Sequence, residues 1–350
     1  MTGTLFVALL ALSSCGKKGG TPDWDTPGGG TAAATEAVQP AKPAAPAPAK
    51  APETPKAAPA AEAPEATVSR EPESSTADGL RFMGYNVENW LTMDRYVDRK
   101  QLKDSPKPDS EKKAVIQLIV KNHPDVLGIC EIGTAGDFAE IQESLKAAGL
   151  DLPHTHYTGG SDPTRHLGLL SRYPITGTGK AADMEYQMNG QTYGFNRGIL
   201  DATIEAKGKS YRFLGVHLKS KRDVEDGDQE QMRINEAHLL RKHVDSILGA
   251  DPAARLVVYG DFNDTYPSKA LRAVTTGEDD AQHLTPIYLK DSRGEAWTHH
   301  WGNQDIYSRI DFIMASQALK KEIDFRSSHI IDDPDWSKAS DHRPVLAIFR

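Results

Sequence analysis

Five short polar motifs, most of them directly behind an apolar run, constrain this chain more than any other feature. Short apolar runs that are bounded by turn residues are typical of buried β-strands. Carboxylate, carboxamide and imidazole side chains would therefore lie at strand ends, where several of them could converge on one cleft. The motifs are GYNVEN at residues 84–89, CE at 130–131, GVH at 215–217, GDFND at 260–264 and SDHRP at 340–344.

The apolar pattern predicts one mixed α/β domain over residues 79–350. Continuous or alternating apolar runs mark the strands, and apolar residues spaced three and four apart mark the helices. We expect strands at residues 80–86, 125–130, 166–171, 255–259, 310–314 and 345–349, a hairpin from 199–206 and 211–218, and helices at 111–121, 139–148 and 229–248.

The N-terminal part of the chain differs in composition from the rest. Residues 1–15 combine a short apolar core with LSSC, which resembles a bacterial lipobox, so we expect a signal peptide and lipidation of Cys15. An ordinary secretory signal and an unprocessed apolar N-terminus are the alternatives. Residues 16–78 hold half of the 22 prolines and many alanines, which predicts a disordered linker. The chain would then be an exported, membrane-anchored lipoprotein, periplasmic or at the cell surface, with a secreted form as a variant.

Bulk charge and cysteine content exclude several classes of protein. The formal net charge is −8, so a broad basic surface does not hold this chain on nucleic acid. Only two cysteines occur, Cys15 and Cys130, which excludes a disulfide framework and disfavours a zinc-cysteine site.

Three motif residues suit phosphate and metal chemistry. Glu131 ends an apolar run, and a carboxylate there is costly to bury unless it is paired or bound to a metal. Asp261 and Asn263 lie two residues apart behind another apolar run, so they point to the same side of an extended chain. An ordinary Asp/Asn turn is the alternative interpretation of this pair.

Two histidines are candidates for work on a phosphate. His342 would become an oriented imidazole if it lay beside Asp311, because a carboxylate on one ring nitrogen frees the other for acid–base work. His217 ends a predicted strand and is followed by Lys219, Lys221 and Arg222, a basic cluster suited to an anion. A solvated hairpin edge would explain that cluster equally well.

Taken in order, these motifs resemble the endonuclease/exonuclease/phosphatase superfamily, which includes DNase I. The resemblance rests on Asn86, Glu131, His217, GDFN at residues 260–263, and RIDF and SDHRPV near the C-terminus. It implies a four-layered α/β-sandwich with two central, mostly antiparallel sheets flanked by helices. It also implies hydrolysis of phosphoester bonds with Mg²⁺ or Mn²⁺ as cofactor.

The resemblance assigns roles to single residues. Glu131 would be the principal metal ligand with Asn86 beside it, and Asp341 would complete the metal region. Asp261 would orient the attacking water. The remaining catalytic assignments are Asn263, which would hold the phosphate, Asp311, which would orient His342, and His217, which would bind the scissile phosphate.

The pattern departs from DNase I at one histidine contact and leaves the substrate open. In DNase I the equivalent of His217 pairs with a Glu, and residues 162–166 offer none here. Arg197 and Lys219 are the candidate substrate-binding cations.

A nucleic acid is the expected substrate. A phospholipid or small-molecule phosphodiester is the first alternative, and a catalytically inactive binding module the second. The only membrane contact expected is the lipid anchor, and no protein partner is predicted.

Overall fold

Two six-stranded sheets pack face to face in a computed structural model that describes residues 79–97, 100–222 and 227–350. The predicted signal peptide with Cys15 and the predicted linker lie outside the described residues. No helix in the described part is long and apolar enough to cross a membrane. The first sheet contains, in spatial order, β17 (His329–Ile330), β18 (Val345–Phe349), β1 (Leu80–Trp90), β4 (Val126–Ile132), β6 (His166–Ser171) and β5 (His154–Thr158).

The second sheet has the same plan as the first. Among the described strands, each sheet pairs antiparallel except for one parallel pair near its centre, β1 with β4 and β11 with β12. The predicted hairpin forms its β10 and β11. In spatial order the sheet contains β13 (Thr285–Pro286), β16 (Asp311–Ala315), β12 (Leu256–Asp261), β11 (Lys209–His217), β10 (Ile199–Ala206) and β7 (Ile175–Thr178).

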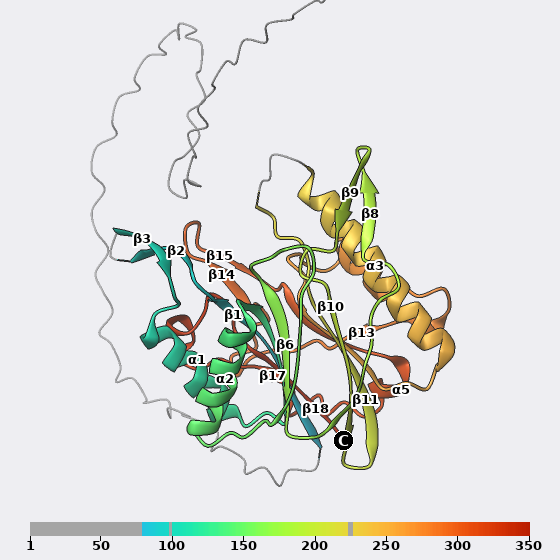
Figure 1. The fold of residues 1–350 in the computed structure, drawn as a ribbon. Helices are drawn as coiled ribbons and strands as arrows, with labels where there is room; N and C mark the ends of the chain where they lie inside the picture. Colours follow the sequence, from blue (N-terminus) through green and yellow to red (C-terminus); the bar gives the residue numbers. More distant parts are fainter. Residues whose placement is uncertain (1–78, 98–99, 223–226) are drawn as a thin grey trace, which may run out of the picture. The chain divides into compact units, whose positions relative to one another are not determined.

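Helices cover the outer face of each sheet, which confirms the predicted four layers (Figure 1). On the first sheet lie α1 (Asp109–Asn122) and α2 (Ala135–Ala147), and on the second lie α3 (Gln229–Ala250) and α4 (Lys269–Thr275). Smaller elements are α5 (Gln317–Lys320), two 3₁₀ turns (Asp280–Gln282 and Trp336–Lys338), and the strand pairs β2 (Met93–Val97) with β3 (Lys100–Ser105), β8 (Glu185–Met188) with β9 (Gln191–Gly194) and β14 (His299–Trp301) with β15 (Ile306–Ser308).

Two helices, α1 and α2, begin earlier than the apolar spacing predicts, whereas α3 begins at Gln229 as predicted. The first turn of α2 is held by a capping box, in which the Thr134 hydroxyl accepts from the Asp137 amide and the Asp137 carboxylate accepts from the Thr134 amide. This turn is polar, so it carries no apolar periodicity. The C-terminal end of α1 was predictable from Pro124, because the residue before a proline avoids a helical backbone. His123 has a left-handed conformation there.

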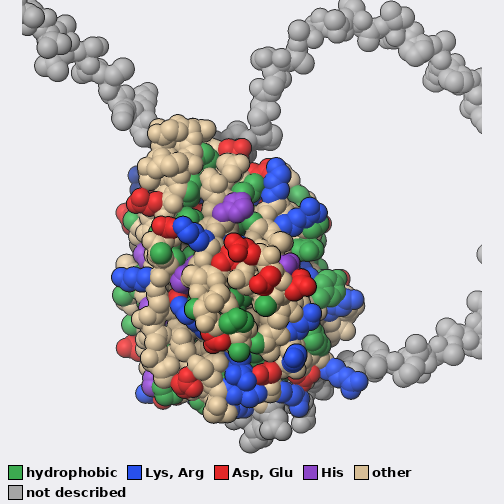
Figure 2. All heavy atoms as spheres, turned by 90° about the vertical axis from the view of Figure 1, so that its right-hand side faces the viewer, with side chains coloured by type: hydrophobic (Ala, Val, Ile, Leu, Met, Phe, Trp, Pro, Cys, Tyr) green, Lys and Arg blue, Asp and Glu red, His purple; other side chains and the backbone are tan. Residues whose placement is uncertain are grey.

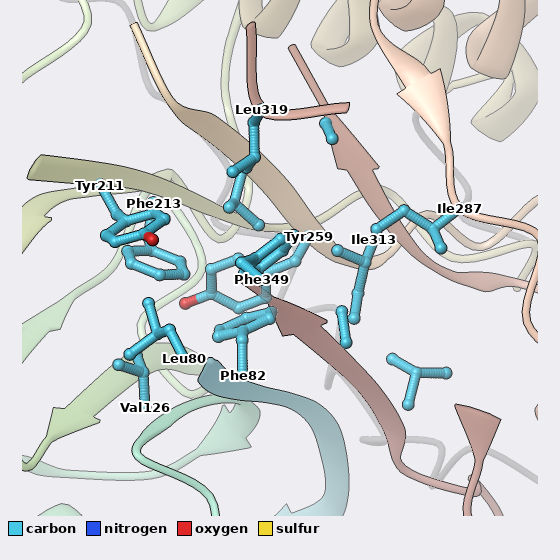
Figure 3. Packing of buried hydrophobic residues seen from close by; sticks show 14 of the residues in the cluster. Leu80, Phe82, Val126, Tyr211, Phe213, Tyr259, Ile287, Ile313, Leu319 and Phe349 are labelled. Carbon is cyan, nitrogen blue, oxygen red and sulfur yellow. The ribbon is translucent and has the colours of Figure 1, made fainter. Parts of the chain in front are cut away.

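The space between the sheets is filled by an aromatic core around Tyr259 (Figure 3). Its ring lies 4.7 Å from the Phe82 ring, edge to face. A Cβ on Gly128 would come within 2.1 Å of the Tyr259 ring, and one on Gly215 would come within 2.6 Å of its hydroxyl. The two glycines therefore leave the volume that the tyrosine occupies.

The face on the side of α3 does not segregate charge. Figure 2 shows the face on the side of α3, where basic and acidic side chains are interspersed. On this face a polyanion would meet no broad cationic area, so its binding would depend on local groups of residues.

We predict that Gly128→Ala lowers the free energy of unfolding by roughly 1–3 kcal/mol, because the new methyl group overlaps the Tyr259 ring. Urea unfolding followed by circular dichroism measures the change. Gly302→Ala is the matched control, since no atom lies within 4 Å of its added Cβ. Equal urea midpoints for the two variants would contradict this account of the core.

Candidate active site

The carboxyl ends of four central strands meet at one edge of the sandwich. The parallel pair β1 and β4 places Asn86 opposite Cys130, and the parallel pair β11 and β12 places His217 opposite Asp261. Parallel strands direct their carboxyl ends to the same edge of a sheet, which is where ligands bind in α/β proteins. The two sheets thus bring two pairs of side chains together.

Glu131 enters this site through a β-bulge. The pairing of β4 with β6 shifts between Cys130 and Ile132, and Glu131 has a φ of 65°. An extra residue of this kind breaks the alternation of the strand and turns its side chain in a new direction. One Glu131 oxygen accepts from Asn86 Nδ2 at 3.1 Å, and the other accepts from the Asn89 amide at 2.9 Å.

The Asn86 carboxamide joins the two sheets. Its Nδ2 lies 3.1 Å from Glu131 Oε1, 3.1 Å from Asp261 Oδ2 and 3.4 Å from His342 Nε2. A carboxamide nitrogen carries two hydrogens, so it can donate to both carboxylates. Its Oδ1 accepts from the Glu88 amide at 3.0 Å, which fixes the orientation of the group.

His342 and Asp311 form the predicted oriented pair. Asp311 Oδ2 lies 2.8 Å from His342 Nδ1, and both side chains are buried. Burial alone would lower the pKa of His342, but the Asp311 carboxylate raises it well above its usual range. This shift favours the imidazolium form of His342, whose Nε2 lies 3.7 Å from Asp261 Oδ2.

The pKa values of the two central carboxyl groups, Asp261 and Glu131, are shifted in opposite directions. Burial raises the pKa of Asp261 to about 7, with Asp311 and Glu131 adding to the effect and His342 opposing it. Burial also acts on Glu131, but His217, Arg165 and His342 outweigh it and lower its pKa to about 2. Such a division fits a permanent anion, suited to a metal, beside a group that can exchange a proton near neutral pH.

His217 is neutral and lies near the carboxylates of Glu131 and Asp261. Its Nε2 lies 3.8 Å from Glu131 Oε1 and 3.6 Å from Asp261 Oδ2. Burial lowers its pKa to about 3, and Arg197 contributes to this shift. In the described part of the chain no group hydrogen-bonds its buried Nδ1.

Basic side chains line one flank of the site. The positive charges of Arg197 and Arg165 both act on His217, and Arg197 also acts on Lys219. Arg197 is buried and lies 3.2 Å from Asp162 through its Nε, while its Nη1 hydrogen-bonds no described group. These cations belong to the loops that follow β5, β9 and β11, so the chain folds three separate segments against one flank.

Asn263 is held in place beside Asp261. It has a φ of 50°, and its amide donates to Asp261 Oδ1 at 2.8 Å. Its Nδ2 donates to the Leu218 carbonyl at 2.9 Å, which ties the β12 loop to the β11 loop. The chain is therefore not extended here as expected, and the bond from the Asn263 amide to Asp261 forms the Asp/Asn turn that was the alternative interpretation.

Two further residues at the site were not among the predicted ones. The Asp341 amide donates to Glu88 Oε2 at 3.0 Å, and Asp341 Oδ2 lies 3.6 Å from His299 Nε2. The His299 ring centroid is 4.6 Å from that of His342. Glu88 belongs to the first motif and could have been ranked, whereas nothing in the sequence connects His299 with Asp341.

The donor set fits a divalent cation. Ligand atoms of Glu131, His217 and Asp261 lie within 4.8 Å of one another, and so do those of His299, Asp341 and His342. Burial and the Asp341 charge raise the pKa of Glu88 to about 7, which shows how crowded the carboxylates are. Mg²⁺ and Mn²⁺ prefer carboxylate oxygens, which Glu131, Asp261 and Asp341 supply in these groups, and a bound cation would offset the repulsion.

Comparison with known proteins identifies the family. Residues 99–342 match the profile of the Endonuclease/Exonuclease/phosphatase family. No curated protein sequence matches the chain.

Several solved structures share the fold at low sequence identity. The human Nocturnin catalytic domain with bound sulfate anion is 18% identical, with a TM-score of 0.56 over 78% of this chain and 94% of its own. A family protein from Leptotrichia buccalis C-1013-b is 17% identical, with a TM-score of 0.54 over 77% and 99%. The 3′ phosphatase NExo from Neisseria, bound to product DNA hairpin, is 16% identical, with a TM-score of 0.53 over 77% and 99%. With the profile match over most of its length, the chain belongs to the endonuclease/exonuclease/phosphatase family of phosphoester hydrolases.

Proposed function

We propose that this enzyme is a divalent-metal-dependent nuclease that cleaves DNA or RNA by in-line attack of water. The observation that carries the proposal is the position of Asn86 Nδ2, within 3.1 Å of a carboxylate from each sheet and 3.4 Å from His342. Ionised carboxylate, proton-exchanging carboxyl and imidazolium groups thus surround one point. A phosphodiester needs this combination, because its transition state gathers negative charge on oxygen.

Each group has a task that its electrostatic state permits. A bound Mg²⁺ or Mn²⁺, held by Glu131 with Asn86 and Asp341, would neutralise charge on the phosphate. Asp261, with a pKa of about 7, orients the attacking water and accepts its proton. The His342 imidazolium, held by Asp311, donates to a phosphoryl oxygen.

The rim of the site favours nucleic acid over lipid. The stacked rings of His300 and Tyr307 lie 4.3 Å apart on β14 and β15, and Tyr307 is half exposed. This surface adjoins the metal region, since the His300 amide donates to the Asp341 carbonyl at 3.0 Å. Bases stack on such rings, while phosphates would contact Arg197 and Lys219 on the other flank. The NExo structure with product DNA hairpin is consistent with a nucleic-acid substrate.

We also propose that the enzyme acts outside the cytoplasm, attached to a membrane through a lipid on Cys15. The support is the sequence alone, an apolar segment that ends in LSSC. The proline- and alanine-rich residues 16–78 would keep the enzyme at a distance from the bilayer.

We predict that His342→Ala and Asp311→Asn each lower kcat by roughly 10²- to 10⁴-fold. The first change removes the proton donor, and the second removes the carboxylate that orients the imidazole and keeps it protonated. Nicking of a supercoiled plasmid in Mg²⁺ measures the rate, and EDTA should abolish it. Sphingomyelin and bis(p-nitrophenyl) phosphate are assayed in parallel.

His238→Ala is the matched control for these variants, since His238 is exposed on α3. It should nick at the wild-type rate. Unchanged nicking by His342→Ala would refute the role of that residue. Hydrolysis of sphingomyelin without nicking of the plasmid would refute the nuclease.

We predict an acid limb in kcat/KM that depends on the metal concentration. Asp261, with its pKa of about 7, is protonated below that pH, so activity falls as the pH drops through this range. Glu131, with a pKa of about 2, stays ionised and contributes nothing to the limb. Higher Mg²⁺ should move the midpoint to lower pH, because Asp261 lies in one group of ligand atoms with Glu131, and a cation there favours the ionised form of Asp261. A midpoint that does not respond to Mg²⁺ would show that the metal binds away from Asp261.

We predict that Cys15→Ser releases the protein from the membrane fraction of cells that express the full chain. Mass spectrometry of the wild-type N-terminus should find Cys15 as the first residue, with attached acyl chains. An unmodified Cys15 in membrane extracts would overturn the anchor and leave the nuclease proposal intact.

A further inference from the structure

Two of the three loops on the cationic flank of the active site carry Arg197 and Lys219, and neither residue belongs to a helix or strand. Arg197 lies between β9 and β10, and Lys219 follows β11. Both side chains are buried, and their positive charges repel each other. Something must therefore hold the two loops together against this repulsion.

Glu236 of α3 makes that connection. Its side chain is fully buried, with 0% exposure. One carboxylate oxygen accepts from the Asn196 amide at 2.8 Å, and the other accepts from the Lys219 amide at 2.6 Å. A single carboxylate thus binds the backbone of both loops, next to the residues that carry the positive charge. Burial raises the pKa of Glu236 to about 7, and the bonds from these two amides oppose the shift by stabilising the ionised form.

Arg233 holds the same loop from the other side. It lies one helical turn before Glu236, on the same face of α3, and is 3% exposed. Its Nη1 donates to the Lys219 carbonyl at 3.1 Å, and its Nε donates to Asp264 Oδ2 at 3.2 Å. The Lys219 peptide groups are therefore fixed through both N–H and C=O, and the loop after β12 is tied to them.

Packing of α3 does not require these charges. Its apolar residues Ala237, Leu240, Val244 and Ile247 already bury it against the second sheet. Buried charged groups are often no more stabilising than apolar residues of the same volume, because they lose their hydration. What Glu236 and Arg233 add is a fixed position for three loops beside the site, through separate bonds to each loop.

We propose that Glu236 and Arg233 are positioning residues, which set the spacing of Arg197 and Lys219 so that a phosphate group of the substrate fits between them. This proposal rests on the proposed function, because it assumes that the cleft binds a phosphate ester. Neither residue contacts the reacting atoms.

The test compares Glu236→Gln with His243→Gln in the full chain. His243 lies seven residues further along the same face of α3 and binds the buried Asp201 at 2.8 Å, so its loss also breaks a buried polar pair. Glutamine keeps the shape of Glu236 but has only one acceptor oxygen, so one loop is released. Inorganic phosphate affinity in Mg²⁺ is measured by titration calorimetry, KM and kcat on a DNA oligonucleotide, and Tm by circular dichroism.

We expect Glu236→Gln to weaken phosphate binding and raise KM about tenfold or more, with kcat within about twofold of wild type. His243→Gln should lower Tm without changing either constant. Arg233→Lys should act in the same direction as Glu236→Gln, and the double variant should show less than the sum of the two effects, since both act on Lys219. If Glu236→Gln changes only Tm, as His243→Gln does, the pair is merely structural.

The phosphate measurement separates this proposal from the proposed function. A wild-type protein that cleaves no nucleic acid, but whose phosphate affinity still falls in Glu236→Gln, would refute the nuclease and support the positioning role. A wild-type protein that cleaves DNA, with equal phosphate affinity in both glutamine variants, would refute the positioning role alone.

Discussion

The packing of the Tyr259 ring between the sheets determines how far apart the two halves of the active site lie. Side chains two residues apart on a strand point to the same face. Two positions before the site residues Asp261, Asn86 and His217 lie Tyr259, Gly84 and Gly215. The Tyr259 ring, with glycines around it, therefore forms the layer directly below the catalytic groups. With larger residues at those positions the sheets would stand further apart, and Asn86 could not bridge Glu131 to Asp261.

Above that layer, the site is held by hydrogen bonds that each connect different parts of the fold. Asn86 joins the two sheets, and Ser340 Oγ donates to the Asn86 carbonyl at 2.9 Å, which ties the C-terminal motif to β1. The result is a group of carboxylates in different states. Glu131 is ionised beside positive neighbours, and Asp261 can hold a proton near neutral pH. Such an arrangement is costly in the absence of a ligand. The cost is consistent with a site organised for cation and phosphate rather than for stability.

Much of this architecture was predictable, because strands, helices and the motifs behind them depend on local patterns. Asp311 on β16 and His342 in the segment before β18 were expected to form a pair, and they do. Contacts between distant segments were not predictable. Glu236 reads as one polar residue on an amphipathic helix, although it is fully buried against two loops. His299 lies on a short strand without apolar alternation, so no pattern placed it beside Asp341.

The bulge at Glu131 has an evolutionary consequence. Deletion of that one position would remove the shift in the pairing of β4 with β6 and the left-handed residue in β4. The shortened protein would be free of this strain, yet it would lack the strongest anion of its site. Selection for stability alone would thus favour loss of the residue, and only selection for turnover retains it. Inactive relatives can therefore be recognised by a strand one residue shorter than β4, as well as by a substitution of Glu131.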